Sequence, residues 1–288
     1  MINKGIKEQV MKVVFILTAC VSIAAVALIC IFVFANGLPG ILEIGVFKFL
    51  FGKTWRPANN LYGIFPMIIG SIYVTAGALI IGVPIGILTA IFMAKFCPDS
   101  LYRFMKPAVD LLAGIPSVVY GFFGLVVLVP FVRENFGGRG FSVLTASVLL
   151  GIMILPTIIS VSEAAIRAVP KNYYEGGLAL GATHERSVFH ATVPAAKSGI
   201  FAGIVLGVGR AIGETMAVMM VAGNQAVIPN KLTAGVRTMT TNIVLEMGYA
   251  TDLHQEALIG TAVVLFVFIL IINLSFSLLK GRQANDED

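Results

Sequence analysis

Six apolar runs, each long enough to cross a lipid bilayer, dominate the sequence. They cover residues 13–34, 68–94, 108–132, 143–165, 199–223 and 257–279. An α-helix needs about 20 apolar residues to cross the hydrocarbon core of a membrane. Because lipid offers no hydrogen bonds to the backbone, a spanning segment must satisfy its own N–H and C=O groups, as a helix does. The runs therefore predict an all-α integral membrane protein with six transmembrane helices.

The composition excludes a soluble enzyme. Charged residues make up 12% and hydrophobic residues 58% of the chain, whereas a soluble domain is about a quarter charged. The net charge of +5 gives no indication of nucleic-acid binding. The three cysteines show no CxxC spacing and the three histidines no HExxH spacing, so no disulfide framework and no metal site is predicted. Without a GxxxxGK[ST] motif the chain is predicted to be no enzyme, to need no cofactor and to hydrolyse no ATP itself.

The basic residues predict the orientation of the spans. If the N-terminus lies inside the cell, the inner segments hold twelve lysines and arginines and the outer segments seven, with Arg210 inside a span. Positive charge favours the cytoplasmic side of a membrane. Both termini and residues 166–198 are therefore predicted to be cytoplasmic, in a multi-pass protein of the cell membrane. The first apolar run is too long for a signal peptide, which predicts a retained span.

Residues 1–60 are predicted to form a unit of their own, with an N-terminal transmembrane helix and an extracytoplasmic interfacial loop. The loop mixes aromatic and basic side chains, a composition typical of a membrane interface. We expect a short interfacial helix there, and the alternative is a plain extracellular loop. These side chains are Phe47, Lys48, Phe49, Phe51, Lys53, Trp55 and Arg56.

Prolines and paired glycines indicate that the spans pack in a bundle around a pathway. A proline inside a span frees a carbonyl that a neighbouring helix or water must satisfy. The pairs Gly203–Gly207 and Gly209–Gly213 each place two glycines on one face of a helix, which favours close helix approach. We expect packing, more than contact with cargo, to be their role.

The polar stretch 173–200 lies between two spans and is predicted to form two short helices joined by a turn. Gly181 suits the left-handed conformation that ends a helix. Thr183 suits the cap of a second helix, with Glu185 near its positive end, and Pro194 is expected to break or restart that helix. A helix–turn–helix in this position must face water or a partner, and we expect Ser187 to be reachable from the cytoplasm.

The same stretch resembles the cytoplasmic loop of membrane subunits of ATP-binding-cassette importers, E-A-A-x3-G-x9-I-x-L-P. The positions that carry the resemblance are Glu175, Gly176, Gly177, Gly181, Ala191, Val193 and Pro194. The resemblance implies that these residues couple the chain to an ATPase. The double glycine is the main departure from the pattern, since each glycine costs a helix about 1 kcal/mol against alanine.

A more literal match, Glu163-Ala164-Ala165, has Val169 where the glycine of the pattern should fall. It also ends an apolar run instead of lying in a polar loop. We therefore read it as part of a span, with Glu163 near the cytoplasmic end where water reaches it.

Arg210 and Glu214 are two charges within the fifth run. A charge at mid-membrane costs about 2.5–3.5 kcal/mol on insertion scales, and residues four apart share a face of a helix. We interpret them as lining a polar pathway, because an arginine fork binds phosphate oxygens in a bidentate manner. The alternative is a structural ion pair. Ser117 and Tyr120, which follow a proline in the third run, are further candidates for the pathway, although such hydroxyls more often satisfy a broken helix.

Three segments indicate which group of importer permeases the chain resembles. Residues 62–75, 111–125 and 208–218 are similar to the permeases of phosphate importers, of the PstC type. The resemblance implies a type I importer permease fold over residues 61–280, with cytoplasmic coupling helices in 166–198 and an acidic cytoplasmic tail at 281–288. It also implies inorganic phosphate as cargo and several partners besides membrane lipid. These are a sister permease in a heterodimer, two cytoplasmic ATP-binding-cassette subunits and an extracytoplasmic phosphate-binding protein.

Other functions remain alternatives at this stage. A permease for another oxyanion, such as sulfate or molybdate, is disfavoured by resemblance only. A passive anion channel needs no loop with coupling spacing, and a membrane-embedded enzyme needs a nucleophile and base or a metal site that the sequence does not suggest.

Overall fold

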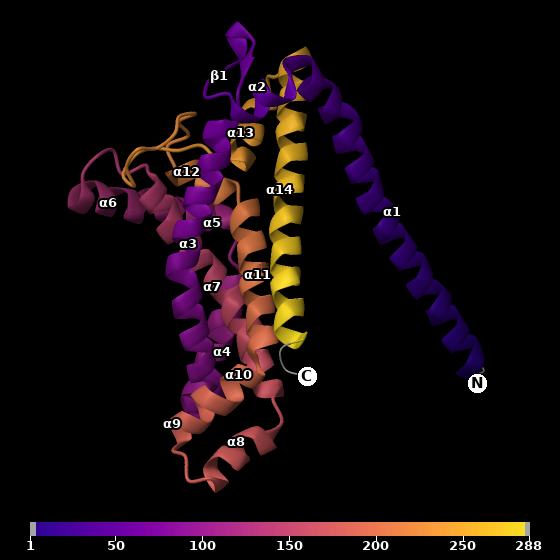
Figure 1. Cartoon of the computed structure of the whole chain (residues 1–288), viewed down its shortest axis with the longest axis vertical. Coiled ribbons are helices and arrows are strands. Elements are labelled where there is room, and N and C mark those ends of the chain that lie inside the picture. The colour runs from indigo at the N-terminus through magenta and orange to yellow at the C-terminus, as the bar shows by residue number, and fades with distance from the viewer. Residues whose placement is uncertain (1–3, 286–288) are drawn as a thin grey trace.

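The computed structural model describes the backbone of residues 4–285 and the side chains of residues 8–276. In Figure 1, helices α3, α7, α11 and α14 stand side by side along the long axis, and α1 leans away from them. We call the end that carries α8 to α10 the loop end, and the end that carries β1, β2 and α13 the hairpin end. The lower part of α1 and the last turns of α14 both point toward the loop end.

Helices make up nearly all of the described fold. The α-helices are α1 (Lys4–Ile44), α2 (Val46–Phe51), α3 (Phe65–Ile91), α4 (Asp99–Gly114), α5 (Ser117–Phe123), α6 (Val129–Phe136), α7 (Val143–Ala168), α8 (Lys171–Ala179), α9 (His184–Ser187), α10 (Val193–Ala195), α11 (Lys197–Gly213), α12 (Met216–Val221), α13 (Met239–Glu246) and α14 (Asp252–Asn285). Single π-helical turns cover Phe92–Phe96, Gly124–Leu128 and Val188–Thr192, and a 3₁₀ turn covers Pro57–Asn59. Strands β1 (Trp55–Arg56) and β2 (Leu61–Tyr62) pair antiparallel, with Trp55 opposite Tyr62.

The structure confirms the membrane fold predicted from the six apolar runs. Among the described residues, five helices are long and apolar enough to cross a membrane. A sixth span forms if the helices His184–Ala195 and Lys197–Gly213, which meet at an angle of 68°, count as one. The acidic tail 286–288 lies outside the described residues.

Two of the predicted spans are not continuous helices, which corrects the sequence analysis. The run 108–132 breaks at Ile115, which is extended because the ring of Pro116 disfavours helix in the residue before it. The membrane-spanning helix begins only at Ser117. The run 199–223 breaks at Glu214, where ψ is 127° and α11 ends.

Helix α7 is the centre of the bundle, with α3 on one side and α11 on the other. Glycines permit both contacts: a β-carbon at Gly82 would lie 2.8 Å from Ile154, and one at Gly207 would lie 2.9 Å from Ile158. The prediction for Gly203 and Gly207 is therefore confirmed. At Gly209 and Gly213 an added β-carbon meets nothing within 4 Å in the described chain, so a packing role for this pair stays a prediction.

Helix α1, unlike α7, is mostly exposed within the described chain. The most apolar window of α1 is 0% buried within the described chain, against 67% for that of α7. Only its last turns pack on α14, where a β-carbon at Gly37 would lie 2.7 Å from Val263. A short helix, α2, does form in the predicted interfacial loop. Trp55, in strand β1 of the hairpin, is buried and packs edge-on against Tyr62.

Candidate functional site

Arg210 lies near the end of α11 and faces α7. Its Nη1 donates a hydrogen bond to Oγ1 of Thr157, over 3.0 Å. The close approach of α7 and α11 at Gly203 and Gly207 brings the two side chains together. Sequence reasoning missed Thr157, and the available signal was a hydroxyl directly after Pro156 within an apolar run.

The expectation that Glu214 shares a helical face with Arg210 is wrong. Glu214 is the first residue beyond α11 and has extended backbone angles. Its carboxylate accepts a hydrogen bond from the backbone N–H of Ala217, over 3.2 Å, at the start of α12. Its carbonyl oxygen accepts a second bond, from Oγ1 of Thr240, over 3.2 Å. The carboxylate therefore stabilises a break in the span, and in the described chain it forms no ion pair with Arg210.

The guanidinium of Arg210 consequently keeps most of its donors free. An arginine side chain carries five N–H donors, and Thr157 is the one partner of this guanidinium found among the described residues. A half-buried cation with free donors attracts an anion, and a planar fork suits an oxyanion with several acceptor oxygens.

The two hydroxyl candidates on α5 differ in what they bind. Ser117 is the first residue of α5 and is half-buried. Tyr120 is buried, and its hydroxyl donates to the carbonyl oxygen of Leu112 over 2.9 Å. This bond crosses the break between α4 and α5, and the same carbonyl also accepts the N–H of Ile115, over 3.4 Å. The geometry thus gives Tyr120 a local role at the break.

The turn between α8 and α9 forms as the sequence predicts. Gly181 has φ of +83° directly after the end of α8. The N–H of Ala182 bonds to the carbonyl of Gly177, over 3.1 Å, and that of Gly181 to the carbonyl of Leu178, over 2.9 Å. These two bonds form a Schellman motif, which ends a helix on a left-handed glycine. Thr183 then caps α9 by accepting a bond from the N–H of Arg186, over 3.3 Å.

Packing explains one of the two adjacent glycines of the loop and not the other. A β-carbon at Gly177 would lie 2.5 Å from Oγ of Ser187, because α8 packs directly on α9. At Gly176 an added β-carbon meets nothing within 4 Å. Ser187 is only 2% exposed as a result of this contact, so the expectation that it is reachable from solvent is wrong.

Aromatic contacts hold the two short helices against the bundle. The hydroxyl of Tyr174 on α8 lies 2.8 Å from Nδ1 of His184 on α9. The His184 ring also packs edge-on against Phe96, at 4.8 Å between centroids, in the π turn after α3. Leu180, at the tip of the turn, is 91% exposed. Sequence reasoning gave this residue no role.

The remaining residues of the coupling pattern follow α9. Ala191 is half-buried in the π turn, and Val193 packs against a buried cluster that includes Val188 and Ile200. Pro194 is exposed in α10, near the C-terminal end of the helical stretch His184–Ala195, and α10 begins directly after the π turn. The 68° bend comes just after it, at Ala196. Glu175 is exposed on α8.

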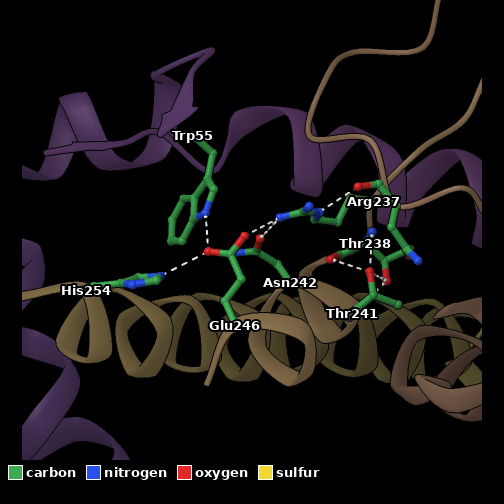
Figure 2. Close-up of polar contacts among 8 residues, drawn as sticks. Trp55, Arg237, Thr238, Thr241, Asn242, Glu246 and His254 are labelled. Carbon is green, nitrogen blue, oxygen red and sulfur yellow. Dashed lines mark hydrogen bonds and ion pairs between the residues drawn. The ribbon is translucent and has the colours of Figure 1, made fainter. Parts of the chain in front are cut away.

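At the hairpin end, Figure 2 shows a network around the buried carboxylate of Glu246. The carboxylate accepts bonds from Nη1 of Arg237 over 2.6 Å, from Nε1 of Trp55 over 2.8 Å and from Nε2 of His254 over 2.9 Å. These residues come from the hairpin, from the segment before α13, from α13 and from α14. The network therefore fastens four separate parts of the chain together.

A second buried carboxylate lies toward the loop end. Glu163 is 2% exposed, so the expectation that water reaches it is wrong. It accepts bonds from the hydroxyl of Tyr102 over 2.6 Å, from Nζ of Lys106 over 3.1 Å and from Nε of Arg167 over 2.7 Å. The bond to Glu163, together with burial, raises the pKa of Tyr102 above its usual value. These contacts fix the amphipathic helix α4 to α7.

Proteins of known type share most of this chain. Its residues 82–285 match the family described as "Binding-protein-dependent transport system inner membrane component". A "Probable ABC transporter permease protein YqgH" of Bacillus subtilis is 42% identical, over 93% of this chain and 90% of its own. A "Phosphate transport system permease protein PstC" of Mesorhizobium japonicum is 35% identical, over 85% and 81%. A probable PstC of Methanocaldococcus jannaschii is 33% identical, over 84% of each chain.

Solved structures resemble the fold. A chain of the MetNI methionine ABC transporter in an inward-facing conformation superposes with a TM-score of 0.56 at 20% identity, over 76% of this chain and 94% of that one. A chain of a bacterial ABC transporter involved in the import of alginate gives 0.58 at 14% identity, over 95% and 99%. At this identity the likeness concerns architecture alone. With the family match over most of its length, the chain belongs to the binding-protein-dependent transport system inner membrane components.

Proposed function

We propose that this chain is the membrane-spanning permease subunit of an ATP-driven phosphate importer. The observation that carries the proposal is the identity of 32–35% to several proteins named as phosphate permeases, over most of the chain. Arg210 adds chemical support, because its free donors lie within a span and suit an oxyanion. The chain forms half of the pathway, and a sister permease forms the other half.

Separate subunits bind and hydrolyse the ATP. Two cytoplasmic ATP-binding-cassette proteins dock on α8 to α10, and the exposed Leu180 supplies an apolar contact next to Glu175. Their closure pushes on the loop, and the rigid contacts of Tyr174 and Gly177 carry the push to α11. The bend of 68° at Ala196 changes as the bundle alternates between a state open to the outside and a state open to the cytoplasm.

The loop end lies in the cytoplasm and the hairpin end outside. Lysine and arginine distribution supports this orientation. On the outer side an extracytoplasmic phosphate-binding protein docks near Asn224 and Gln225, which line a pocket of about 470 Å³ together with Arg139. Phosphate then passes Arg210, which holds the anion transiently because a tight site would slow its release.

The test is ATP-dependent uptake of labelled phosphate by the complex reconstituted in vesicles. We expect uptake that excess unlabelled sulfate does not reduce. Sulfate uptake in place of phosphate would favour a permease for another oxyanion, and uptake without ATP would favour a channel. Arg210→Gln should lower uptake while the complex still assembles.

Orientation has its own test, in which Leu180 is the better position because Ser187 is buried. In membranes that hold the permease without its ATPase subunits, which would otherwise cover this position, Leu180→Cys should react with a membrane-impermeant thiol reagent from the cytoplasmic side only. The matched control is Phe47→Cys at the hairpin end, which is also exposed and should react from the outside. Labelling with the opposite sidedness would contradict the topology.

A further inference from the structure

Thr157 makes a different contact from several other hydroxyls on the spanning helices. Thr18, Ser22, Thr261 and Ser275 each donate to a carbonyl oxygen four residues earlier in their own helix. Thr157 instead accepts a bond from Nη1 of Arg210, on another helix. A hydroxyl that accepts still carries its own proton, and within residues 8–276 that proton has no acceptor.

No carboxylate of the described chain pairs with Arg210, whose partner there is the neutral hydroxyl of Thr157. The nearest carboxylate in sequence, that of Glu214, is engaged by the N–H of Ala217. The guanidinium therefore presents free N–H groups next to the free O–H of Thr157. These donors are complementary to the unprotonated oxygens of an oxyanion, which accept hydrogen bonds.

Space is available beside this set. Helix α11 packs on α7 through Gly203 and Gly207, whereas added β-carbons at Gly209 and Gly213 meet open space. Arg210 lies between the packed face and the open face, since it neighbours Gly209 and precedes Gly213 by three residues. The bond to Thr157 holds the guanidinium against the packed side, with its other edge left for a ligand.

We propose that Thr157 is a second anion-coordinating residue of the pathway, which orients Arg210 and donates its own hydroxyl proton to the same oxyanion. The inference rests on the proposed function, because it assumes that an oxyanion passes Arg210. It assigns two roles to one hydroxyl, namely to accept from the cation and to donate to the cargo. Valine, which has the same shape and no hydroxyl, loses both roles, and serine keeps both.

The experiment compares Thr157→Val with Thr157→Ser in the complete complex, by ATP-driven uptake of labelled phosphate with the binding protein in fixed excess. We expect the valine variant to lose uptake on the order of tenfold, the scale of a hydrogen bond to a charged group. The serine variant should stay within about twofold of the unaltered protein. Ser162→Ala is the control, because Ser162 lies in the same helix contact and its buried hydroxyl has no partner in the described chain.

Dependence on Arg210 is tested in the background Arg210→Lys, which keeps a charge but loses the planar fork. There the valine change should cost less than about twofold, since the orientation of the fork no longer matters. An equal cost in both backgrounds would overturn the inference. So would normal uptake by Thr157→Val, or a serine variant as impaired as valine with less complex in the membrane. In those cases uptake of phosphate by the unaltered complex still supports the proposed function, whose own failure is the absence of that uptake.

Discussion

Charged groups in this protein occupy two contrasting environments. The carboxylates of Glu163 and Glu246 each accept three hydrogen bonds from side chains, including ones on other elements, and both are nearly inaccessible to solvent. Among the residues that the structure describes, the guanidinium of Arg210 has one partner, which is neutral. The first arrangement fixes helices in place, because losing a charged member leaves its partner with less compensation. The second leaves binding capacity unused, which is the state expected of a site that takes up a passing ligand.

The largest effect is expected at the hairpin end. The side chains of Arg237 and Glu246 are only 17% and 9% exposed. Glu246→Gln keeps the shape of the side chain and leaves the arginine buried without its counter-charge. We expect a loss of about 3–5 kcal/mol in the free energy of unfolding, measured as a lower thermal midpoint or failure of the complex to accumulate.

The double variant Arg237→Gln with Glu246→Gln is the matched control for that prediction. It removes both charges, so it should be less destabilised than Glu246→Gln alone. Equal damage in the single and double variants would mean that the network acts through shape and neutral hydrogen bonds, and the contrast with Arg210 would weaken.

A smaller effect is expected at Glu163. Its cationic partners reach solvent, with Arg167 45% and Lys106 32% exposed, so water compensates them when the carboxylate is lost. Glu163→Gln should cost about 1–3 kcal/mol, the range for an unsatisfied buried group. The measurement is the thermal midpoint of the purified complex, compared directly with that of Glu246→Gln. A larger loss than at Glu246 would contradict the ranking by solvent access.

Two adjacent glycines of the coupling loop show a similar contrast, because Gly177 packs against α9 and Gly176 faces open space. Gly177→Ala forces a methyl group against Ser187 and should cost about 1–3 kcal/mol locally, as overpacking does. Gly176→Ala meets open space and should stabilise α8 by up to about 1 kcal/mol. The readout is ATP-driven uptake together with copurification of the ATPase, which only Gly177→Ala should lower. Similar behaviour of the two variants would refute the packing explanation.

Local features of the fold were predictable from sequence, and long-range contacts were not. The apolar runs predict spans, and Gly181 and Thr183 predict their turn, because each depends on a few neighbouring residues. Thr157 lies 53 positions from Arg210, and Trp55 lies 191 from Glu246, so no periodicity connects them. The error at Glu214 has a similar origin. Helical spacing was assumed through a segment that the carboxylate and Thr240 hold in an extended conformation.

The smallest change in stability is expected at Arg210 itself, and it tests the comparison most directly. A charge within a membrane costs about 2.5–3.5 kcal/mol on insertion scales, and Arg210 has no anionic partner in the described chain to offset that cost. Arg210→Gln removes the charge and retains an amide that can still bond to Thr157. The thermal midpoint should therefore change by less than about 1 kcal/mol equivalent, or rise, while phosphate uptake falls. A loss of stability as large as that of Glu246→Gln would mean that Arg210 anchors helices, because only such a residue stabilises the fold in the absence of cargo.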